Sequence, residues 1–277
     1  MIYGAYFDES DERPGFAIGG YSAAYDTWLH LDWAWGELLK RWQLNYYKAS
    51  ECEHGLVEFA QYRDDPTDQK SPLKEHERAK LREIKTEFVD AICKHHDDLQ
   101  GYGAAFVVED FERIIAEDPI ARKTFLDKPY YLGAQLCLVA AAAPALDSNI
   151  RRSGIDRIEI RPIFDSHEEY SGKAKEIFDN FVKKNPKSAK VLMPPAYDDD
   201  VKNSSLQVAD VLVYELRKKL SRKIKDPSDE YMRVPLQRLL PAIYRVYKLD
   251  HASLKVIAAH QTPDTIGIPH LMPEELW

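Results

Sequence analysis

The sequence predicts an α/β protein built on a mixed β-sheet that is flanked by helices. Two short runs of extended-chain residues near the N-terminus, separated by a turn, predict an antiparallel pair of strands. From residue 100 onward, strand-like runs alternate with helical segments, and this alternation indicates crossovers that return parallel strands to one sheet. The chain has 277 residues, of which 44% are apolar, so it can bury a substantial core.

The antiparallel pair is predicted on residues 2–7 and 16–20, with Pro14 and Gly15 marking the turn between them. The connecting segment reads "DESDERPG", so an apolar strand gives way abruptly to acids. Asp, Ser, Pro and Gly are favoured in turns, and this segment alone is typical of a solvated hairpin. The remaining sequence must show whether acids at this strand end have a chemical role.

A helical insertion is predicted over about residues 26–98. Its first helix begins at Asp26 and carries an apolar stripe at helical spacing, which is typical of a surface that faces a core. The stripe consists of Trp28, Leu31, Trp35, Leu38 and Trp42. A second helix is predicted to begin at Ser71 and Pro72, with Ser as the N-cap and Pro in the first turn.

The later elements are a strand, a helix, a strand, a helix, a short strand and a helix. They are predicted on residues 102–108, 129–147, 157–165, 170–184, 190–195 and 204–221. With the insertion set aside, this is the element order of the ribonuclease H-like fold, a five-stranded mixed sheet with helices on both faces. The predicted domain spans residues 1–225. Residues 226–277 are predicted to form a helical C-terminal extension packed on the same domain, with one helix in "EYMRVPLQRLLPAIYRVYKL".

Composition excludes several classes of protein. The formal charge of −8 gives a field that repels polyanions, which argues against a strong nonspecific nucleic-acid binder. No apolar run approaches the roughly 20 residues of a membrane-spanning helix. Cys52, Cys93 and Cys137 show no pairing or metal-ligand spacing. We therefore expect a cytoplasmic protein without membrane contact or disulfides.

Two basic segments interrupt the acidic background. They span Lys183–Lys190 and Arg217–Lys225. Either could make weak contact with a nucleic-acid backbone, and either could equally complement the C-terminus of a helix. The C-terminal extension is a second candidate surface, for a protein partner.

A second acid follows a second strand, because Asp165 comes directly after Phe164, just as Asp8 comes after Phe7. In α/β sheets, ligands bind beyond the carboxyl ends of the strands, so neighbouring strands would bring both acids into one crevice. Glu9 follows in extended chain and is expected to point to the opposite face unless the strand bends. Pro162 lacks a ladder donor, which favours an edge strand or a bulge.

A third acid, Asp210, lies within the apolar helix of "SSLQVADVLVYELRKKL". A buried Asp requires a partner because removing its hydration costs several kcal/mol, and this partner can be a metal ion or an arginine. Gln207, three residues earlier, can belong to the same site. It also completes an S-x-x-Q capping box that begins at Ser204, and the two roles are compatible.

Four short motifs now stand in order along the chain: "AYFDES", "YKASE", "IFD" and "SSLQVAD". Together they resemble the bacterial and phage family called domain of unknown function 3800, which is marked by an N-terminal Asp-Glu and a C-terminal Gln-x-x-Asp and is regarded as ribonuclease H-like. The resemblance covers about residues 1–221. It implies a carboxylate site that contains Asp8, Asp165 and Asp210 as metal ligands, with further site residues nearby. These are Glu9, Lys48, Glu51 and Gln207.

The sequence departs from ribonuclease H-like nucleases at one point. Those enzymes usually take a further Glu from the helix after the third strand, whereas the helix predicted on residues 129–147 has no acid before Asp147. Glu51 of the insertion could replace it, or could be an ordinary surface charge. The departure bears more on activity than on fold.

Converging carboxylates favour a hard divalent cation such as Mg²⁺ or Mn²⁺, because like charges a few ångströms apart cannot all stay ionised alone. Such ions activate water and stabilise the leaving oxygen of a phosphodiester. The sequence therefore predicts a metal-dependent nuclease or phosphodiesterase acting on RNA or DNA. Two alternatives stay open: a catalytically silent ribonuclease H-like module that binds a protein or nucleic acid, and a structural site whose acids pair with Arg or Lys.

Overall fold

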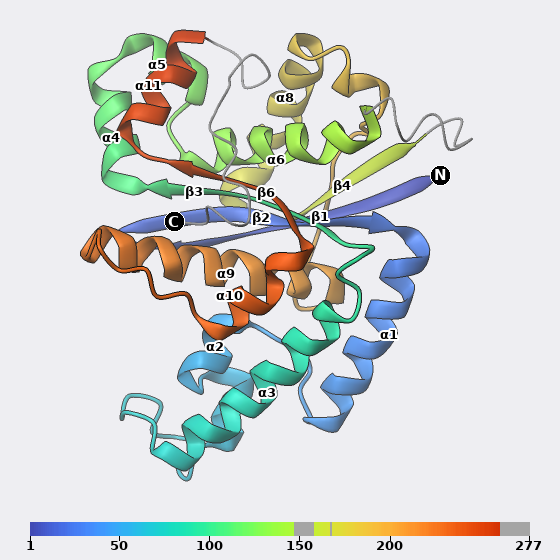
Figure 1. Cartoon of the computed structure of the whole chain (residues 1–277), viewed down its shortest axis with the longest axis vertical. Coiled ribbons are helices and arrows are strands. Elements are labelled where there is room, and N and C mark those ends of the chain that lie inside the picture. The colour runs from blue at the N-terminus through green and yellow to red at the C-terminus, as the bar shows by residue number, and fades with distance from the viewer. Residues whose placement is uncertain (147–157, 167, 261–277) are drawn as a thin grey trace.

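The protein was analysed as a computed structural model, which describes residues 1–146, 158–166 and 168–260. Six strands form one sheet in the order β5-β4-β1-β2-β3-β6 (Figure 1). The strands are Ile2–Glu12 (β1), Gly15–Ala24 (β2), Gln100–Val107 (β3), Glu159–Asp165 (β4), Ala196–Asp198 (β5) and Ile243–Leu249 (β6). Strands β1, β2 and β3 are antiparallel to one another in turn, whereas β4, β5 and β6 each join a neighbour in parallel. The predicted α/β class with a mixed sheet is confirmed.

The predicted count of five strands is wrong, because the C-terminal extension contributes β6 beside β3. The helix expected in residues 230–249 is confined to α10 (Val234–Leu239) and a 3-10 turn that contains Pro241. Proline interrupts a helical hydrogen-bond ladder, and the branched and aromatic residues of "IYRVYKL" then favour extended chain. The extension is therefore part of the sheet, and its removal would expose β3.

Two layers of helices cover the two faces of the sheet (Figure 1). One layer consists of α4 (Val108–Glu117), α5 (Pro119–Phe125), α6 (Pro129–Leu146), α8 (Glu168–Lys184) and α11 (His251–His260). The other is dominated by α9 (Ser204–Lys225), which packs on β1, β2 and β3. Each layer closes its own buried apolar cluster against the sheet. Helices α4 and α5 lie between the predicted strand 102–108 and the predicted helix 129–147, where no secondary structure is predicted from the sequence.

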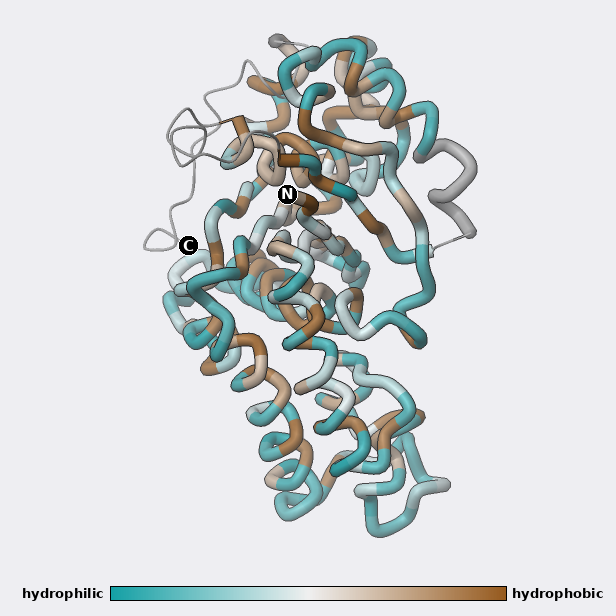
Figure 2. Tube along the Cα trace, turned by 90° about the vertical axis from the view of Figure 1, so that its right-hand side faces the viewer, coloured by the Kyte–Doolittle hydropathy of each residue, from teal (hydrophilic) through white to brown (hydrophobic). Residues whose placement is uncertain are grey.

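The helical insertion extends from the α9 side of the sheet (Figure 2). It comprises α1 (Tyr25–Arg41), α2 (Ala49–His54), a 3-10 helix over Val57–Tyr62 and α3 (Glu75–Cys93). Trp28 and Trp35 of the predicted stripe are buried, which confirms a core-facing surface. Helix α3 begins four residues later than the predicted Ser71, because the Glu77 carboxylate accepts a hydrogen bond from the Lys74 amide and fixes the first turn there.

Pro162 lies inside β4, between β1 and β5, and not at an edge of the sheet. The amide of Glu159 donates to the Met1 carbonyl on the β1 side, and the amide of Ile160 donates to the Val191 carbonyl on the β5 side. Strand alternation therefore directs the nitrogen of Pro162 toward the β5 side. Pairing there is interrupted between an isolated bridge at Ile160 and the start of the β4–β5 ladder at Ile163, so the missing donor leaves no strand bond unmade.

Helix α6 is the one described helix that is long and apolar enough to cross a membrane by length and composition alone. In the fold, 67% of its span is buried, and it packs on β2 and β3. A core helix passes the same test, and α6 forms the centre of the buried cluster on its face of the sheet.

Candidate metal centre

The acids of β1 lie where this strand loses one of its two neighbours. Pairing of β1 with β4 ends at Phe7 opposite Phe164, whereas pairing with β2 continues to Glu12. The expectation that the first strand ends at Phe7 is therefore wrong. Because Phe7 and Phe164 are in register, Asp8 and Asp165 follow at the same level, at the point where the two strands part.

Asp8, Glu9 and Asp165 each offer a carboxylate oxygen, and these atoms all lie within 4.8 Å of one another. Glu9, expected on the opposite face unless the strand bends, thus brings its carboxylate to those of Asp8 and Asp165. Its carboxylate reaches the same point because β4 has ended beside it and its side chain is one methylene longer than that of Asp8. We refer to these three carboxylates and that of Asp210 as the acidic cluster.

Asp8 is 3% exposed, and its two oxygens differ. Oδ1 accepts a hydrogen bond of 2.7 Å from the amide of Glu9, whereas Oδ2 has no hydrogen-bond partner in the described part of the chain. Burial raises the pKa of Asp8 well above its usual value, and the charges of Asp210 and Glu9 raise it further. An unpaired buried carboxylate oxygen is costly, and a bound cation would remove that cost.

Asp210 belongs to the buried face of α9 and is 4% exposed. One of its oxygens accepts a hydrogen bond of 2.5 Å from the amide of Ala49, the first residue of α2. Burial raises the pKa of Asp210 to about 6, although the Ala49 amide and the charge of Lys48 oppose the rise. Within the described residues, no arginine or lysine forms an ion pair with Asp8 or Asp210. The alternative in which an arginine or lysine pairs with Asp210 is therefore not found among the described residues.

Asp165 is held by backbone donors. Its Oδ1 accepts hydrogen bonds from the amides of Ser166 (2.9 Å) and Asp200 (3.1 Å). Burial and the charge of Asp200 nevertheless raise its pKa. Burial and the charge of Asp165 raise the pKa of Glu9 to about 8. Each member of the acidic cluster thus has a raised pKa, and burial is the largest cause in every case.

The positive charge of Lys48 acts on the whole acidic cluster, because it lowers the pKa of each of the four acids. Its Nζ already pairs with Asp200 at 2.7 Å. Hydrogen bonding to Asp200 raises the pKa of Lys48, although burial opposes the rise, so this amine stays charged. Because Lys48 is shared with Asp200, it cannot balance the negative charge of the four acids when they are ionised.

Asp199 and Asp200 are adjacent in the sequence but have different surroundings. Asp200 pairs with Lys48 and donates its amide to Asp165. Asp199 instead accepts from the Val201 amide and pairs with Lys202 at the surface, so it caps a loop. A charged loop residue gives no periodic signal, so sequence reasoning could not distinguish the two.

Gln207 connects three segments through its side-chain amide. Oε1 accepts hydrogen bonds from the Trp35 indole (2.9 Å) and the Tyr47 amide (3.0 Å), and Nε2 donates to the carbonyls of Asp200 and Val201. The predicted capping box is therefore wrong. The N-cap of α9 is Asn203, whose side chain accepts from the first amides of the helix. Gln207 positions the acidic cluster without joining it.

Glu51 is half-buried on α2 and accepts hydrogen bonds from the Tyr46 hydroxyl at 3.0 and 3.2 Å. It does not belong to the group of oxygens formed by Asp8, Glu9 and Asp165. No residue of the described helix α6 is acidic. Asp147, the acid that follows this helix, lies outside the described residues. Among the described residues, the further acid whose carboxylate lies with those of Asp8 and Asp165 is Glu9 and not Glu51.

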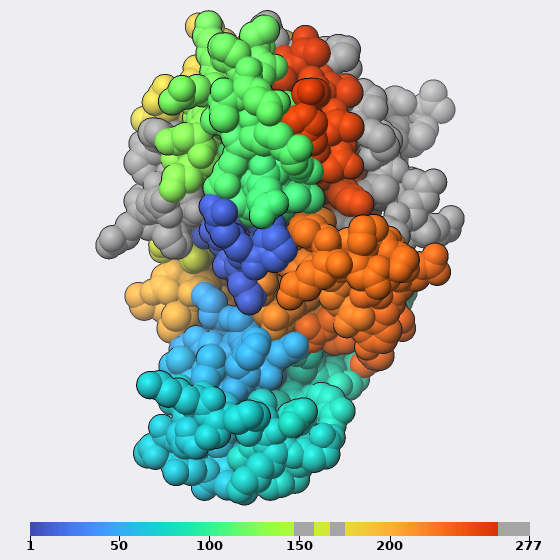
Figure 3. Space-filling model, turned by 90° about the vertical axis from the view of Figure 1, so that its left-hand side faces the viewer, coloured from blue at the N-terminus to red at the C-terminus, as the bar shows by residue number. Residues whose placement is uncertain are grey.

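The two basic segments have different surroundings. Arg217 is buried and bonds to Ser10 and Glu12 at the end of β1, and Lys219 is buried and donates to backbone carbonyls. These two side chains of the predicted segment Arg217–Lys225 are thus committed to internal contacts. Lys183 and Lys184 of the other segment lie in the last turn of α8. Figure 3 shows the β1–β2 turn at the surface, with the insertion below it and the C-terminal half of α9 beside it.

No protein-family model matches this chain, and no curated protein or solved structure is significantly similar to it.

Proposed function

We propose that this protein is a metal-dependent hydrolase of phosphodiester bonds in RNA or DNA. The observation that carries the proposal is the buried, unpartnered Oδ2 of Asp8, a residue whose carboxylate lies with those of Glu9 and Asp165 and whose pKa is raised by the charge of Asp210. Four acids whose pKa values are all raised, with one shared lysine beside them, have the charge and oxygen chemistry that a hard divalent cation would satisfy.

Asp8, Asp165 and Asp210 would hold Mg²⁺ or Mn²⁺, and Glu9 is close enough to contribute an oxygen. When bound, such an ion supplies an activated water and neutralises charge on the phosphate. The strand order β5-β4-β1-β2-β3 is compatible with a ribonuclease H-like arrangement, to which β6 adds an edge. The motif resemblance to domain of unknown function 3800 agrees with that arrangement.

The protein's own groups would act around the phosphate in separate ways. The Lys48 amine, 2.7 Å from Asp200, can move to a phosphate oxygen and exchange one anionic partner for another. Glu9, with a pKa near 8 in the ion-free protein, holds a proton at neutral pH until a cation displaces it. Gln207 and the Ala49 amide keep α9 and α2 in fixed relation, so that Asp210 faces Asp8.

Cleavage assays with Mn²⁺ test the proposal. Purified protein should cut single-stranded or hybrid oligonucleotides, and Asp210→Asn should reduce cutting at least about 100-fold, because Asn is a poor metal ligand of the same size. Asp199→Asn is the matched control, since this neighbouring acid is exposed and capped by Lys202. Equal cutting by wild type and Asp210→Asn would refute the assignment. Metal binding without cutting would favour a catalytically silent module.

A further inference from the structure

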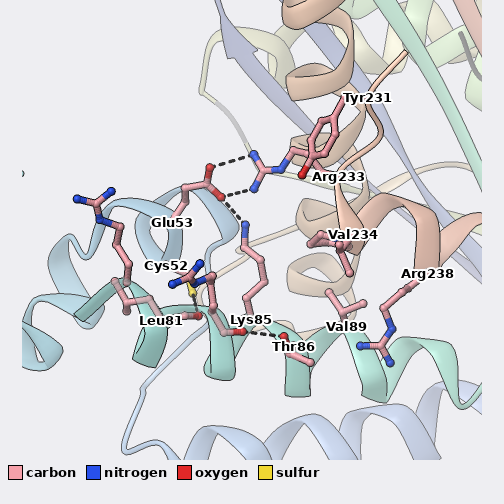
Figure 4. Close-up of a pocket in the computed structure, with 13 residues that line it drawn as sticks. Cys52, Glu53, Leu81, Lys85, Thr86, Val89, Tyr231, Arg233, Val234 and Arg238 are labelled. Carbon is pink, nitrogen blue, oxygen red and sulfur yellow. Dashed lines mark hydrogen bonds and ion pairs between the residues drawn. The ribbon is translucent and has the colours of Figure 1, made fainter. Parts of the chain in front are cut away.

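A cavity of about 560 Å³ lies where the helical insertion meets the C-terminal extension (Figure 4). It is bounded by α2, α3, α10 and the segment that leads into α10, and it does not include the acidic cluster. Its charged lining consists of Arg78, Arg82, Lys85, Arg233, Arg238 and Glu53. Five cations and one acid line the cavity, on a protein whose formal charge is −8. Beside the cavity, Arg238 pairs with Asp90. The volume is that of a small-molecule site.

The inner wall of the cavity is a closed ion-pair network. Lys85 Nζ lies 2.5 Å from Glu53 and 3.3 Å from Glu215, and Arg233 bonds to Glu53 through both terminal nitrogens. Arg233 Nε also lies 3.0 Å from Glu215. The charges of Lys85 and Arg233 are balanced by those of Glu53 and Glu215, so this wall has no net charge to attract a ligand. The remaining arginines determine the charge that a ligand would meet.

Two of these arginines, Arg78 and Arg82, lie four residues apart on one face of α3 and share the rim. Arg78 donates two hydrogen bonds to the Leu73 carbonyl, and no carboxylate of the described residues lies within ion-pair distance of it. Arg82 pairs with Glu75, and both side chains are at least two-thirds exposed. Exposed pairs contribute little, so an incoming anion can replace Glu75 at small cost.

The rest of the cavity is apolar. Leu81 and Val89 lie on the α3 side, and Tyr231 and Val234 lie opposite them. Tyr231 and Val234 are 54% and 59% exposed, which is unusual for side chains of this size beside a cavity. The Arg222 guanidinium lies 4.5 Å from the centre of the Tyr231 ring and holds that ring in place. A planar ring of a ligand could therefore pack against Tyr231 and Val234, in the same cavity as the arginines.

We propose that this cavity binds a nucleotide, with the phosphate on Arg78 and Arg82 and the base against Tyr231 and Val234. Paired guanidinium groups match the oxygens of a phosphate, and an aromatic ring accepts any base by stacking. The apolar wall accounts for the preference over inorganic phosphate, which has no apolar surface to bury. The site is independent of the proposed hydrolase activity.

Calorimetric titration with AMP in EDTA tests this site without the metal centre. Wild type should bind AMP, whereas the double variant Arg78→Ala/Arg82→Ala should bind it at least about tenfold more weakly. Arg113→Ala is the control, because Arg113 is also an exposed arginine in an ion pair, but on α4 outside the cavity. Both arginines are exposed on α3, so these substitutions leave the core intact. Absence of AMP binding to wild type at millimolar concentration would overturn the proposal, as would equal binding by the double variant.

Further ligands and variants locate the contacts. Ribose 5-phosphate should bind about tenfold more weakly than AMP, and Tyr231→Ala should remove most of this difference. Equal affinities for the two ligands in wild type would refute the role of the ring. Asp8→Asn should bind AMP as wild type does, whereas loss of AMP binding in Asp8→Asn would place the nucleotide at the acidic cluster and refute the cavity. Loss of nuclease activity alone does not affect this test.

Discussion

Helix α9 carries two buried carboxylates with opposite surroundings. Asp210 and Glu215 are 4% and 1% exposed and lie five residues apart. Glu215 faces Lys85 and Arg233 in a closed network, whereas Asp210 accepts a hydrogen bond from one backbone amide and its charge raises the pKa of Asp8. The same helix thus places one acid among cations and another among anions.

The difference shows how a structural acid can be told from a ligand-binding acid. Burial of a charge is tolerated where an opposite charge replaces the lost water, and Glu215 has such a charge in its ion pairs with Lys85 and Arg233. The acidic cluster has no such charge of its own, because Lys48 is already paired with Asp200. The charge of these acids is reduced by bound protons in the ion-free protein, and in our proposal by a divalent cation.

The largest expected effect is the loss of stability on breaking the balanced network. Glu215→Gln leaves Lys85 and Arg233 with Glu53 alone, so the free energy of unfolding should fall by about 3 kcal/mol. Asp210→Asn removes repulsion and should leave the metal-free protein as stable as wild type or more so. Urea unfolding of both variants measures the contrast. Equal destabilisation by both substitutions would remove the distinction between the two regions.

A smaller effect is expected from divalent cations. Mg²⁺ or Mn²⁺ at tens to a hundred times its Kd should stabilise wild type by roughly 1 to 3 kcal/mol, since it binds the folded state. Asp8→Asn should gain much less, and Asp199→Asn, which alters an exposed acid nearby, should gain as much as wild type. Thermal melts in EDTA and in each ion provide the measurement. A wild type that does not respond to either ion would mean that the acidic cluster is structural.

The two regions should also respond to pH with opposite sign. Carboxyl groups in the unfolded chain titrate near pH 4, whereas burial raises the pKa of Asp210 to about 6 and that of Glu9 to about 8. The folded state therefore binds more protons between pH 4 and 8, and the stability of the metal-free protein should fall by at least about 1 kcal/mol as pH rises through this window.

Glu53 provides the opposite sign. Hydrogen bonds from Arg233 and Lys85 outweigh burial and lower its pKa to about 2, so its contribution is present above pH 4 and is lost as pH falls toward 2. Urea unfolding in EDTA from pH 3 to 8 should therefore show a stability maximum on the acidic side of neutrality. Saturating Mg²⁺ should flatten the alkaline side alone. Stability that rises steadily from pH 5 to 8 without metal would contradict the raised pKa values.

The smallest expected effect comes from Lys48→Met. This lysine is partly exposed and its pair with Asp200 is worth at most about 1 kcal/mol, so unfolding should change little. The fall in stability should extend to higher pH, because without Lys48 the pKa values of the acids in the cluster rise further. Repeating the pH series in this variant checks the shift. An unchanged pH profile would show that Lys48 does not act on the cluster.

Sequence reasoning found the part of the site that local pattern encodes. Asp8 and Asp165 follow apolar strand residues, and Asp210 interrupts an apolar helix, so each stands out from its neighbours. Glu215 stands in the same apolar run and went unnoticed, although the rule that singled out Asp210 applies to it equally. Its partners lie 130 residues before it and 18 residues after it, and no local pattern shows that these cations reach it.

Secondary structure was predicted correctly where the spacing of apolar residues clearly favours a helix or a strand. It was missed where the spacing suits both. The segment that forms α10 and β6 contains apolar residues at spacings that suit a helix, and only Pro235 and Pro241 indicate breaks. Pairing of β6 with β3 decides the outcome, and that contact joins residues about 140 positions apart. The position of Asp200 likewise depends on tertiary contacts with Lys48 and Asp165.

The strand order also determines when this chain can fold during its synthesis. Strands β1, β2 and β3 are complete once residue 107 has left the ribosome, but β4 covers the β1 edge about 50 residues later and β6 covers the β3 edge only after residue 249. At a synthesis rate of about 5–20 residues per second, the nascent sheet keeps an open edge for several seconds or longer. Unpaired edges can pair with strands of other chains, so the β3 edge of the growing chain is open to such pairing until β6 has been made.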